Sequence, residues 1–157
     1  MISVCAQIAI PTPLGISVTL QTFAIALCGY CLPLKYALLS YSTYVLLGIV
    51  GVPVFASFTG GLGVVSGKSG GYILGFIAIA LLCSVSNKFS SFYIAVVFGI
   101  FGTVICHICG VAYLSIVSCG QGTSALLTIS IPLLIKDIAS IIPAKLLSKR
   151  IIRIINR

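Results

Sequence analysis

Acidic side chains are almost absent from this sequence of 157 residues, which contains nine Lys and Arg residues but a single carboxylate, Asp137. General acid–base catalysis commonly uses at least two positioned titratable groups, so one carboxylate and one histidine argue against the usual catalytic constellations. Charged residues make up only 6% of the chain, whereas hydrophobic residues make up 60%. The sequence therefore does not predict an enzyme, and its composition is typical of an integral membrane protein.

Metal and nucleotide sites are also not expected. His107 lies between Cys106 and Cys109, but these positions do not all converge on a helix, and no second cluster supplies the remaining ligands. A packing or hydrogen-bonding role is therefore expected for His107. The string GKSGG at 67–71 lacks the earlier glycine that a phosphate loop needs, because Leu62 stands at that position. No metal and no cofactor are predicted.

Apolar segments separated by glycine, proline and polar clusters predict an all-α fold, a six-helix transmembrane bundle in one domain, residues 1–157. The segments are 1–10, 17–34, 36–52, 72–87, 91–118 and 124–147. At about 1.5 Å per residue, the first is too short to cross a hydrocarbon core of about 30 Å. We expect either a shortened first helix or a true N-terminus further upstream.

The positions of the cations predict the orientation of the bundle. Five of the nine basic residues lie in the last thirteen positions, 145–157, and six spans place them on the same side as Lys35 and Lys88. The opposite side carries Lys68, in the segment 53–71. Because Lys and Arg gather on the cytoplasmic side, both termini are predicted to be cytoplasmic. The basic cluster is expected to flank a membrane and not to bind nucleic acid.

Asp137 and its neighbour Lys136 lie within the apolar run 126–147. A charge in hydrocarbon costs roughly 2.5–3.5 kcal/mol on insertion scales, so such residues usually line a polar cavity or a transport path. The alternative is that Lys136 merely neutralises Asp137 within the helix packing. Since adjacent helical positions point about 100° apart, we expect one of the two side chains to snorkel or to serve another contact.

The segment 53–71, PVFASFTGGLGVVSGKSGG, is too rich in glycine for a plain helix and too apolar for a disordered loop. A re-entrant or lid-like loop is expected, since non-helical backbone at membrane depth must line protein or a cavity. Tyr72, at the end of this loop, is expected either to cover a ligand or to anchor at the membrane interface. Gln21 contributes an amide near the outer end of its helix, where it either contacts a ligand or joins helices.

Four ordered motifs carry a resemblance to a known family. TPLGISVTLQTF, YVLLGIVGVPVF, GGLGVVSGKSGGYILGF and IPLLIKD occur in this order within residues 6–147. Together they resemble the biotin-transporter substrate-binding family, BioY, whose members are the substrate-capture subunits of energy-coupling factor transporters. The resemblance implies a six-helix protein of the bacterial plasma membrane that binds biotin from outside, with a transmembrane coupling subunit and ATPase subunits as partners.

The resemblance also implies roles for particular residues. It places the acid that contacts the ureido ring of biotin at Asp137, and it assigns closure of the pocket to two parts of the outer loop. These parts contain Phe55, Ser57, Gly70, Gly71 and Tyr72. Biotin suits such a site, because its ring donates two N–H groups and its bicycle requires apolar walls.

Two departures from the family pattern affect the expected carboxylate contact. The family usually has proline where this chain has Lys68, and it favours glycine before the acid and lysine three positions after it, where this chain has Lys136 and Ser140. The usual partner of the biotin carboxylate is therefore missing. We expect Lys136 or Lys68 to replace it.

The leading prediction is a biotin-binding membrane subunit that mediates uptake without covalent chemistry. Two alternatives remain at this point. The first is a related subunit for another vitamin, since the pair Lys136 and Ser140 departs from the pattern. The second is a structural or assembly membrane protein without a ligand, in which Asp137 and Lys136 only stabilise helix packing.

Overall fold

A computed structural model of the chain describes residues 1–10, 17–89, 91–117 and 123–155, with side chains from Ser130 onward in the last range. The helices in these ranges are α1 (Ile2–Gln7), α2 (Gln21–Cys31), α3 (Leu34–Ile49), α4 (Leu62–Val65), α5 (Gly70–Val85), α6 (Phe92–Val117) and α7 (Thr123–Ile155). Two 3₁₀ turns, η1 (Ala56–Phe58) and η2 (Ser86–Lys88), join longer elements. Two short strands, β1 (Ala9–Ile10) and β2 (Val18–Thr19), pair antiparallel.

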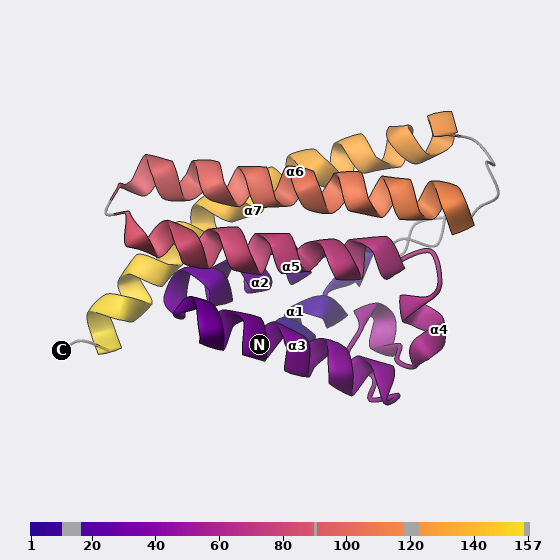
Figure 1. Cartoon of the computed structure of the whole chain (residues 1–157), viewed down its shortest axis with the longest axis horizontal. Coiled ribbons are helices and arrows are strands. Elements are labelled where there is room, and N and C mark those ends of the chain that lie inside the picture. The colour runs from indigo at the N-terminus through magenta and orange to yellow at the C-terminus, as the bar shows by residue number, and fades with distance from the viewer. Residues whose placement is uncertain (11–16, 90, 118–122, 156–157) are drawn as a thin grey trace.

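The long helices form a bundle around a shared apolar core. Helices α5 and α6 run antiparallel side by side, and α7 crosses behind them toward the end where the C-terminus lies (Figure 1). Helix α2 packs against both α5 and α7, whereas α3 lies along the other edge against α5. The short helix α4 covers the end of the bundle opposite to the C-terminus (Figure 1). This arrangement places elements from all parts of the chain around one interior.

Small residues allow α5 and α6 to approach closely. A Cβ at Gly75 would lie 2.8 Å from the Cα of Cys106, and a Cβ at Gly102 would lie 3.0 Å from the Cα of Ile79. Contacts of this kind are typical of membrane helices, in which van der Waals packing of backbones replaces the hydrophobic effect as the main attraction between helices. Replacing either glycine would force the two helices apart.

The all-α prediction is confirmed, whereas several predicted boundaries differ from the structure. The helix expected in 1–10 ends at Gln7, and the helix expected in 17–34 begins only at Gln21, because β1 and β2 pair their backbones between these helices. The glycine-rich outer segment contains η1 and α4 instead of an unbroken loop. Helix α7 continues beyond the apolar run into the basic tail, to Ile155, with two prolines inside it.

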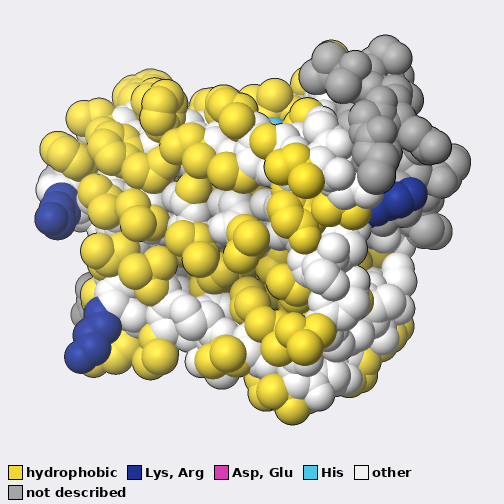
Figure 2. Space-filling model, turned by 45° about the vertical axis from the view of Figure 1, so that its right-hand side comes forward, with side chains coloured by type: hydrophobic (Ala, Val, Ile, Leu, Met, Phe, Trp, Pro, Cys, Tyr) yellow, Lys and Arg dark blue, Asp and Glu magenta, His cyan; other side chains and the backbone are white. Residues whose placement is uncertain are grey.

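Two of the described helical stretches, Gly70–Lys88 and Phe92–Val117, are long and apolar enough to cross a membrane by length and composition. The outer surface fits such a setting. Large apolar side chains are exposed on several helices and turns, for example Val50, Tyr93 and Ile116, which are 77% or more exposed. Hydrophobic side chains cover most of the face in Figure 2, and the cations lie at its edges.

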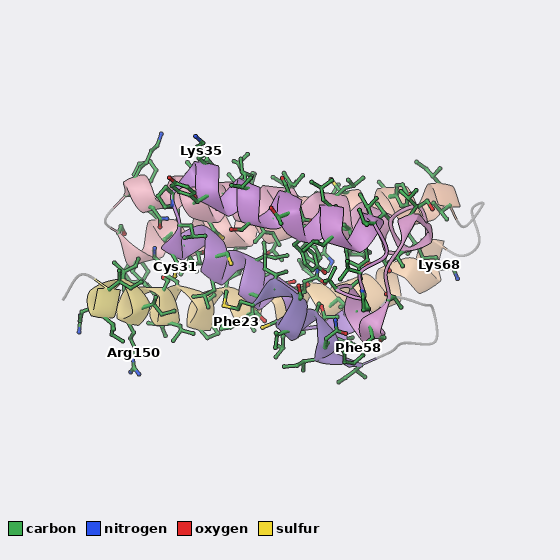
Figure 3. All side chains as sticks on the ribbon, turned by 90° about the horizontal axis from the view of Figure 1, so that it is seen from below. Phe23, Cys31, Lys35, Phe58, Lys68 and Arg150 are labelled. Atoms are coloured by element: carbon green, nitrogen blue, oxygen red, sulfur yellow. The ribbon has the colours of Figure 1, made fainter. Side chains whose placement is uncertain are left out.

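The labelled cations lie at opposite ends of the bundle. Lys35 and Arg150 are at one end, and Lys68 is at the other (Figure 3). This separation agrees with the sequence-based prediction that Lys35 shares a side with the basic tail while Lys68 does not. The two ends therefore differ in chemistry, and each contains a cavity.

Candidate functional site

A cavity of about 310 Å³ lies at the end of the bundle that carries Lys68. Its walls come from the start of α2, the outer segment with η1 and α4, and helices α5, α6 and α7. Ile73, Phe76 and Leu133 supply apolar surface, whereas hydroxyls and an amide come from Ser17, Thr19, Gln21, Thr22 and Thr59. The volume is at the lower end of the range of about 300–1,000 Å³ that is typical of small-molecule sites.

The only carboxylate of the chain forms the charged centre of this cavity. Asp137 is 5% exposed, and its Oδ2 accepts a hydrogen bond from Nε2 of His107 at 3.0 Å. The ammonium of Lys136 lies 2.5 Å from the other carboxylate oxygen, Oδ1, and also donates to the backbone oxygen of Thr19. Asp137 is therefore held by two side chains from two helices, α6 and α7.

Two polar atoms of this cluster have no hydrogen-bond partner among the described residues: Oδ1 of Asp137 and Nδ1 of His107. The Lys136 ammonium is close to Oδ1 but lies outside hydrogen-bonding geometry. An ionised carboxylate can only accept, so Nε2 of His107 donates the hydrogen bond to Asp137. A buried polar atom without a partner costs about 1–3 kcal/mol. The Lys136 ammonium offsets the charge at Oδ1, so Nδ1 of His107 is the atom of this cluster that lacks a polar partner among the described residues.

Tyr72 braces the histidine from α5. Its hydroxyl is hydrogen-bonded to Oγ of Ser130 at 2.9 Å, and its ring meets the ring of His107 edge to face, with centroids 5.5 Å apart. Gly110 makes room for the ring of Tyr72, because a Cβ at Gly110 would lie 2.5 Å from that ring. The position of His107 is therefore fixed by Asp137 on one side and by Tyr72 on the other.

A second set of contacts fixes the opposite wall. Nε2 of Gln21 donates to the hydroxyl of Tyr44 at 3.0 Å, and the ring of Tyr44 meets the edge of the Phe55 ring at 5.5 Å. Phe55 is 2% exposed and covers Gly48, where a Cβ would lie 2.0 Å from the ring. Gln21 thus joins helices through its amide nitrogen while also lining the cavity.

The turn η1 is strained and is held by one side chain from α1. Ser57 and Phe58 have φ of 58° and 56°, in the left-handed region that costs about 1–3 kcal/mol for such residues. Gln7 accepts a hydrogen bond from the Phe58 amide at 2.7 Å. Its Nε2 lies within hydrogen-bonding distance of the carbonyls of Phe55, at 3.1 Å, and Pro53, at 3.3 Å. Gln7 therefore fastens the loop over the cavity to the first helix.

The structure brings most of the predicted site residues to one cavity. Those that line it are Asp137, Lys136, Lys68, Tyr72, Ser57, Phe55 and Gln21. Gly70 and Gly71 do not line it. They begin α5, where a Cβ would collide with the backbone oxygen of Val65 or with the side chain of Tyr113. Their absence of side chains serves packing against α4 and α6.

Lys136 behaves as expected for one of two adjacent helical residues, since it snorkels and makes another contact. Both side chains line the cavity, because the long stem of Lys136 reaches around the helix to Asp137 while it also contacts the Thr19 carbonyl. The position of a residue in a helix sets the direction of its Cβ. The four rotatable bonds of a lysine side chain then determine where its ammonium group lies.

His107 fulfils the expected hydrogen-bonding role, and it also lines the cavity, which the sequence analysis missed. The available signal was that the chain contains one histidine and one acid, both within apolar helices. Burial of two such groups favours their pairing. Gln7 gave no such signal, because its role depends on the path of a loop 46 or more residues away.

Lys68 is exposed at the cavity and forms no ion pair with any described residue. The only acidic side chain of the sequence is already in contact with Lys136 and His107. Lys68 is therefore the cation of this cavity that is available for an anionic group of a ligand.

Comparisons with known proteins agree with this architecture. The model of the BioY family matches residues 1–157. The biotin transporter BioY of Thermotoga maritima is 43% identical over 108 residues, which cover 68% of this chain and 64% of that protein. A probable biotin transporter BioY of Pyrococcus horikoshii is 46% identical over 77 residues, covering 47% of this chain and 45% of that protein. The aligned parts thus span less than two thirds of these relatives.

A solved structure shares the fold. The crystal structure at 2.1 Å of the S-component for biotin from an ECF-type ABC transporter superposes with a TM-score of 0.86. The match covers 97% of this chain and 85% of that chain, at 21% sequence identity. At this identity the similarity shows the fold, and the contents of the cavity must be argued from the residues of this chain.

Proposed function

This chain belongs to the BioY family, and we propose that it is a membrane subunit that binds biotin and takes part in biotin uptake. The observation that carries the proposal is the buried cluster of Asp137, His107 and Lys136, which lines one cavity together with apolar walls. The ureido ring of biotin has two N–H donors and one carbonyl acceptor, and this cluster offers a carboxylate, an imidazole and an ammonium to complement them.

The remaining groups of biotin also find suitable surroundings in the proposal. Lys136 supplies a donor to the ureido oxygen while it stays beside Asp137. The fused rings contact the apolar walls formed by Ile73, Phe76 and Leu133. Apolar walls with a few convergent polar groups are the usual composition of a small-molecule site.

The valerate carboxylate of biotin is assigned to Lys68. Lys136 is engaged with the acid and with the Thr19 carbonyl, whereas Lys68 has no ion-pair partner in the described ranges. Ser57 and the Ser69 hydroxyl lie along the same part of the cavity and supply further donors. A cation at the outer loop in place of the family's usual proline thus replaces the lysine that is missing at Ser140.

The bundle is proposed to be a six-helix transmembrane unit of the bacterial plasma membrane, with the Lys68 end outside. The basic end then lies in the cytoplasm, as the cation distribution favours. The proposed partners are a transmembrane coupling subunit and ATPase subunits, as the name of the structural neighbour suggests for that protein. The function is binding and transport, not catalysis.

Equilibrium binding of labelled biotin to the purified chain in detergent tests the proposal. We expect saturable binding for the parent chain and a loss of about 10–100-fold for Asp137→Asn, because the variant replaces a charged acceptor worth about 1.5–3 kcal/mol. Ser140→Ala is the matched control. Ser140 is on the same helix, and its hydroxyl donates to the backbone oxygen of Lys136 and does not line the cavity.

Competition by unlabelled vitamins separates the alternatives. Displacement of the label by biotin but not by other vitamins supports the assignment, whereas tighter binding of another vitamin identifies a related subunit. No saturable ligand at all, together with equal stability of the parent and of variants at Tyr72, would favour a structural role of the Asp137 cluster.

A further inference from the structure

A second cavity, of about 590 Å³, lies at the opposite end of the bundle. It is bounded by the junction of α2 and α3, the end of α5 with η2, and the later part of α7. Figure 3 shows Cys31, Lys35 and Arg150 at this end, away from Lys68. Lys88, Lys145 and Lys149 line it, and we call it the basic cavity.

Lys145 is the unusual residue of the basic cavity, because it is only 8% exposed. Its ammonium contacts Oδ1 of Asn87 at 3.5 Å and lies 4.6 Å from the centroid of the Tyr30 ring. Both partners are uncharged. An amide at the limit of hydrogen-bonding distance and an aromatic face compensate a buried ammonium only in part.

No acidic side chain of this protein can neutralise the basic cavity. The full sequence contains one carboxylate side chain, and Asp137 is engaged with Lys136 and His107 in the other cavity. Lys149, whose ammonium lies 4.8 Å from the centroid of the Phe92 ring, adds a second charge beside Lys145. Like charges around a partly buried cavity repel each other. No acidic side chain remains to supply the counter-charge, and an anion from outside the chain can supply it.

We propose that the basic cavity binds the phosphate group of an anionic phospholipid, with Lys145 and Lys149 as its contacts. The rim favours a lipid over a free phosphate ion. Leu34, Phe89 and Ile152 line the cavity and are 37–45% exposed, so they offer an apolar surface to acyl chains. Basic pockets between membrane helices on the cytoplasmic side are typical sites for anionic headgroups.

The polar groups of the cavity wall predict the selectivity of this site. The Ser84 hydroxyl donates to the Leu32 carbonyl, and Nδ2 of Asn87 donates to the Gly29 carbonyl. The Ser84 hydroxyl and one of the two N–H groups of Asn87 are thus used within the protein, so the lysines are the main donors left for a headgroup. Charge, and not headgroup shape, should therefore decide binding.

The test measures lipid binding to the purified, delipidated full chain by native mass spectrometry and by thermal stability in detergent. Phosphatidylglycerol should bind saturably and raise Tm, whereas phosphatidylcholine should not. Lys145→Gln should weaken phosphatidylglycerol binding at least tenfold, Lys149→Gln several-fold, and Lys145→Arg little, because it keeps the charge. Lys35→Gln, which removes a charge at the same end outside the cavity lining, should change binding less than twofold.

Three results would contradict the proposed lipid site. Equal binding of phosphatidylglycerol and phosphatidylcholine would show that the charge of the headgroup does not determine binding. An equal loss in Lys35→Gln and Lys149→Gln would indicate general surface electrostatics. Binding of inorganic phosphate as tight as that of phosphatidylglycerol would replace the lipid by a free anion. Biotin binding, measured on the same samples, reports the fold of each variant and is independent of this site.

Discussion

The two ends of the bundle contain lysines in opposite electrostatic situations. At the outer end, Lys136 lies 2.5 Å from a buried carboxylate within its own chain. At the basic end, Lys145 is similarly associated with a cavity, but its described partners are an amide oxygen and an aromatic ring. The same side-chain chemistry is thus completed internally at one end and depends on an external anion at the other.

This difference shows how a chain with one acid distributes its charge. Asp137 is buried in the outer cavity, where Lys136 and His107 hold its carboxylate in position. At the basic end, Lys145 and Lys149 have no acidic side chain of their own chain as partner, and the proposed lipid phosphate supplies the counter-charge. The single carboxylate therefore fixes the arrangement of side chains at the outer end. Its removal should affect the outer end much more than the basic end.

The largest expected effect follows from breaking the internal pair. Asp137→Asn should lower the free energy of unfolding by about 3 kcal/mol, the lower end of the range for buried pairs that lose one partner, because the Lys136 side chain is 29% exposed. Lys136→Gln in the Asp137→Asn background should restore part of this loss. The measurement is unfolding in denaturant, followed by far-UV circular dichroism because the chain contains no tryptophan.

The matched comparison at the basic end is Lys145→Gln, which removes a cation that has no acid partner. In the absence of anionic lipid it should be neutral or stabilising, the opposite sign to Asp137→Asn. An equal loss of stability in both variants would show that the two ends do not differ in the way the structure indicates.

The second expected effect concerns the uncharged contacts of the outer end. Gln7→Leu removes the hydrogen bonds that hold Ser57 and Phe58 in left-handed conformations, so the loop should relax away from the cavity. At about 0.5–1.5 kcal/mol for each of three bonds, biotin affinity should fall at least about tenfold. Ser66→Ala is the control, since it removes one hydrogen bond to the backbone of Leu62 outside the cavity lining.

The affinity of Gln7→Leu for biotin shows whether α1 positions the loop. A loss of affinity in Gln7→Leu with little change in Tm identifies Gln7 as a positioning residue of the loop. Unchanged affinity would mean that Phe55 and Tyr44 hold the loop without help from α1.

The third expected effect separates the two lysines of the outer cavity. Lys68→Gln should weaken biotin up to about fivefold, which corresponds to the 0.2–1 kcal/mol typical of exposed ion pairs. It should leave the affinity for biotinamide, which lacks the carboxylate charge, unchanged. An equal reduction in affinity for both ligands would show that Lys68 supports the loop structure. Lys136 would then be the contact of the biotin carboxylate.

Sequence patterns predicted the helical class and most of the helix positions, because apolar run length and glycine or proline boundaries report local preference directly. They failed where two short strands pair, at β1 and β2, and where a basic tail continues a helix to Ile155. Pairing of strands depends on contacts between segments, which no local pattern contains.

The residues of the candidate site could be predicted from the sequence for a different reason. Asp137, Lys136 and Lys68 stand out in the sequence because ionised groups are rare in it, and the motif resemblance indicated the outer loop. His107 and Gln7 did not stand out as cavity and loop contacts, since hydrogen bonds over 30 to 51 residues in sequence fix their roles. Chemical type predicts that a residue needs a partner, whereas only the fold shows which partner it meets.

The smallest expected effect tests the basic end by changing the ionic strength. In delipidated protein, raising the ionic strength through about 0.1 M, where the Debye length is about 10 Å, should screen the repulsion among Lys88, Lys145 and Lys149 and raise Tm by up to about 2–4 °C. Biotinamide affinity should not change, because the Asp137 cluster is buried and its ligand is neutral. Lys149→Gln should reduce the salt dependence of Tm, whereas Lys68→Gln should not. A flat Tm in the parent chain would contradict the contrast between the ends, since it would mean that the basic cavity carries no uncompensated charge even without lipid.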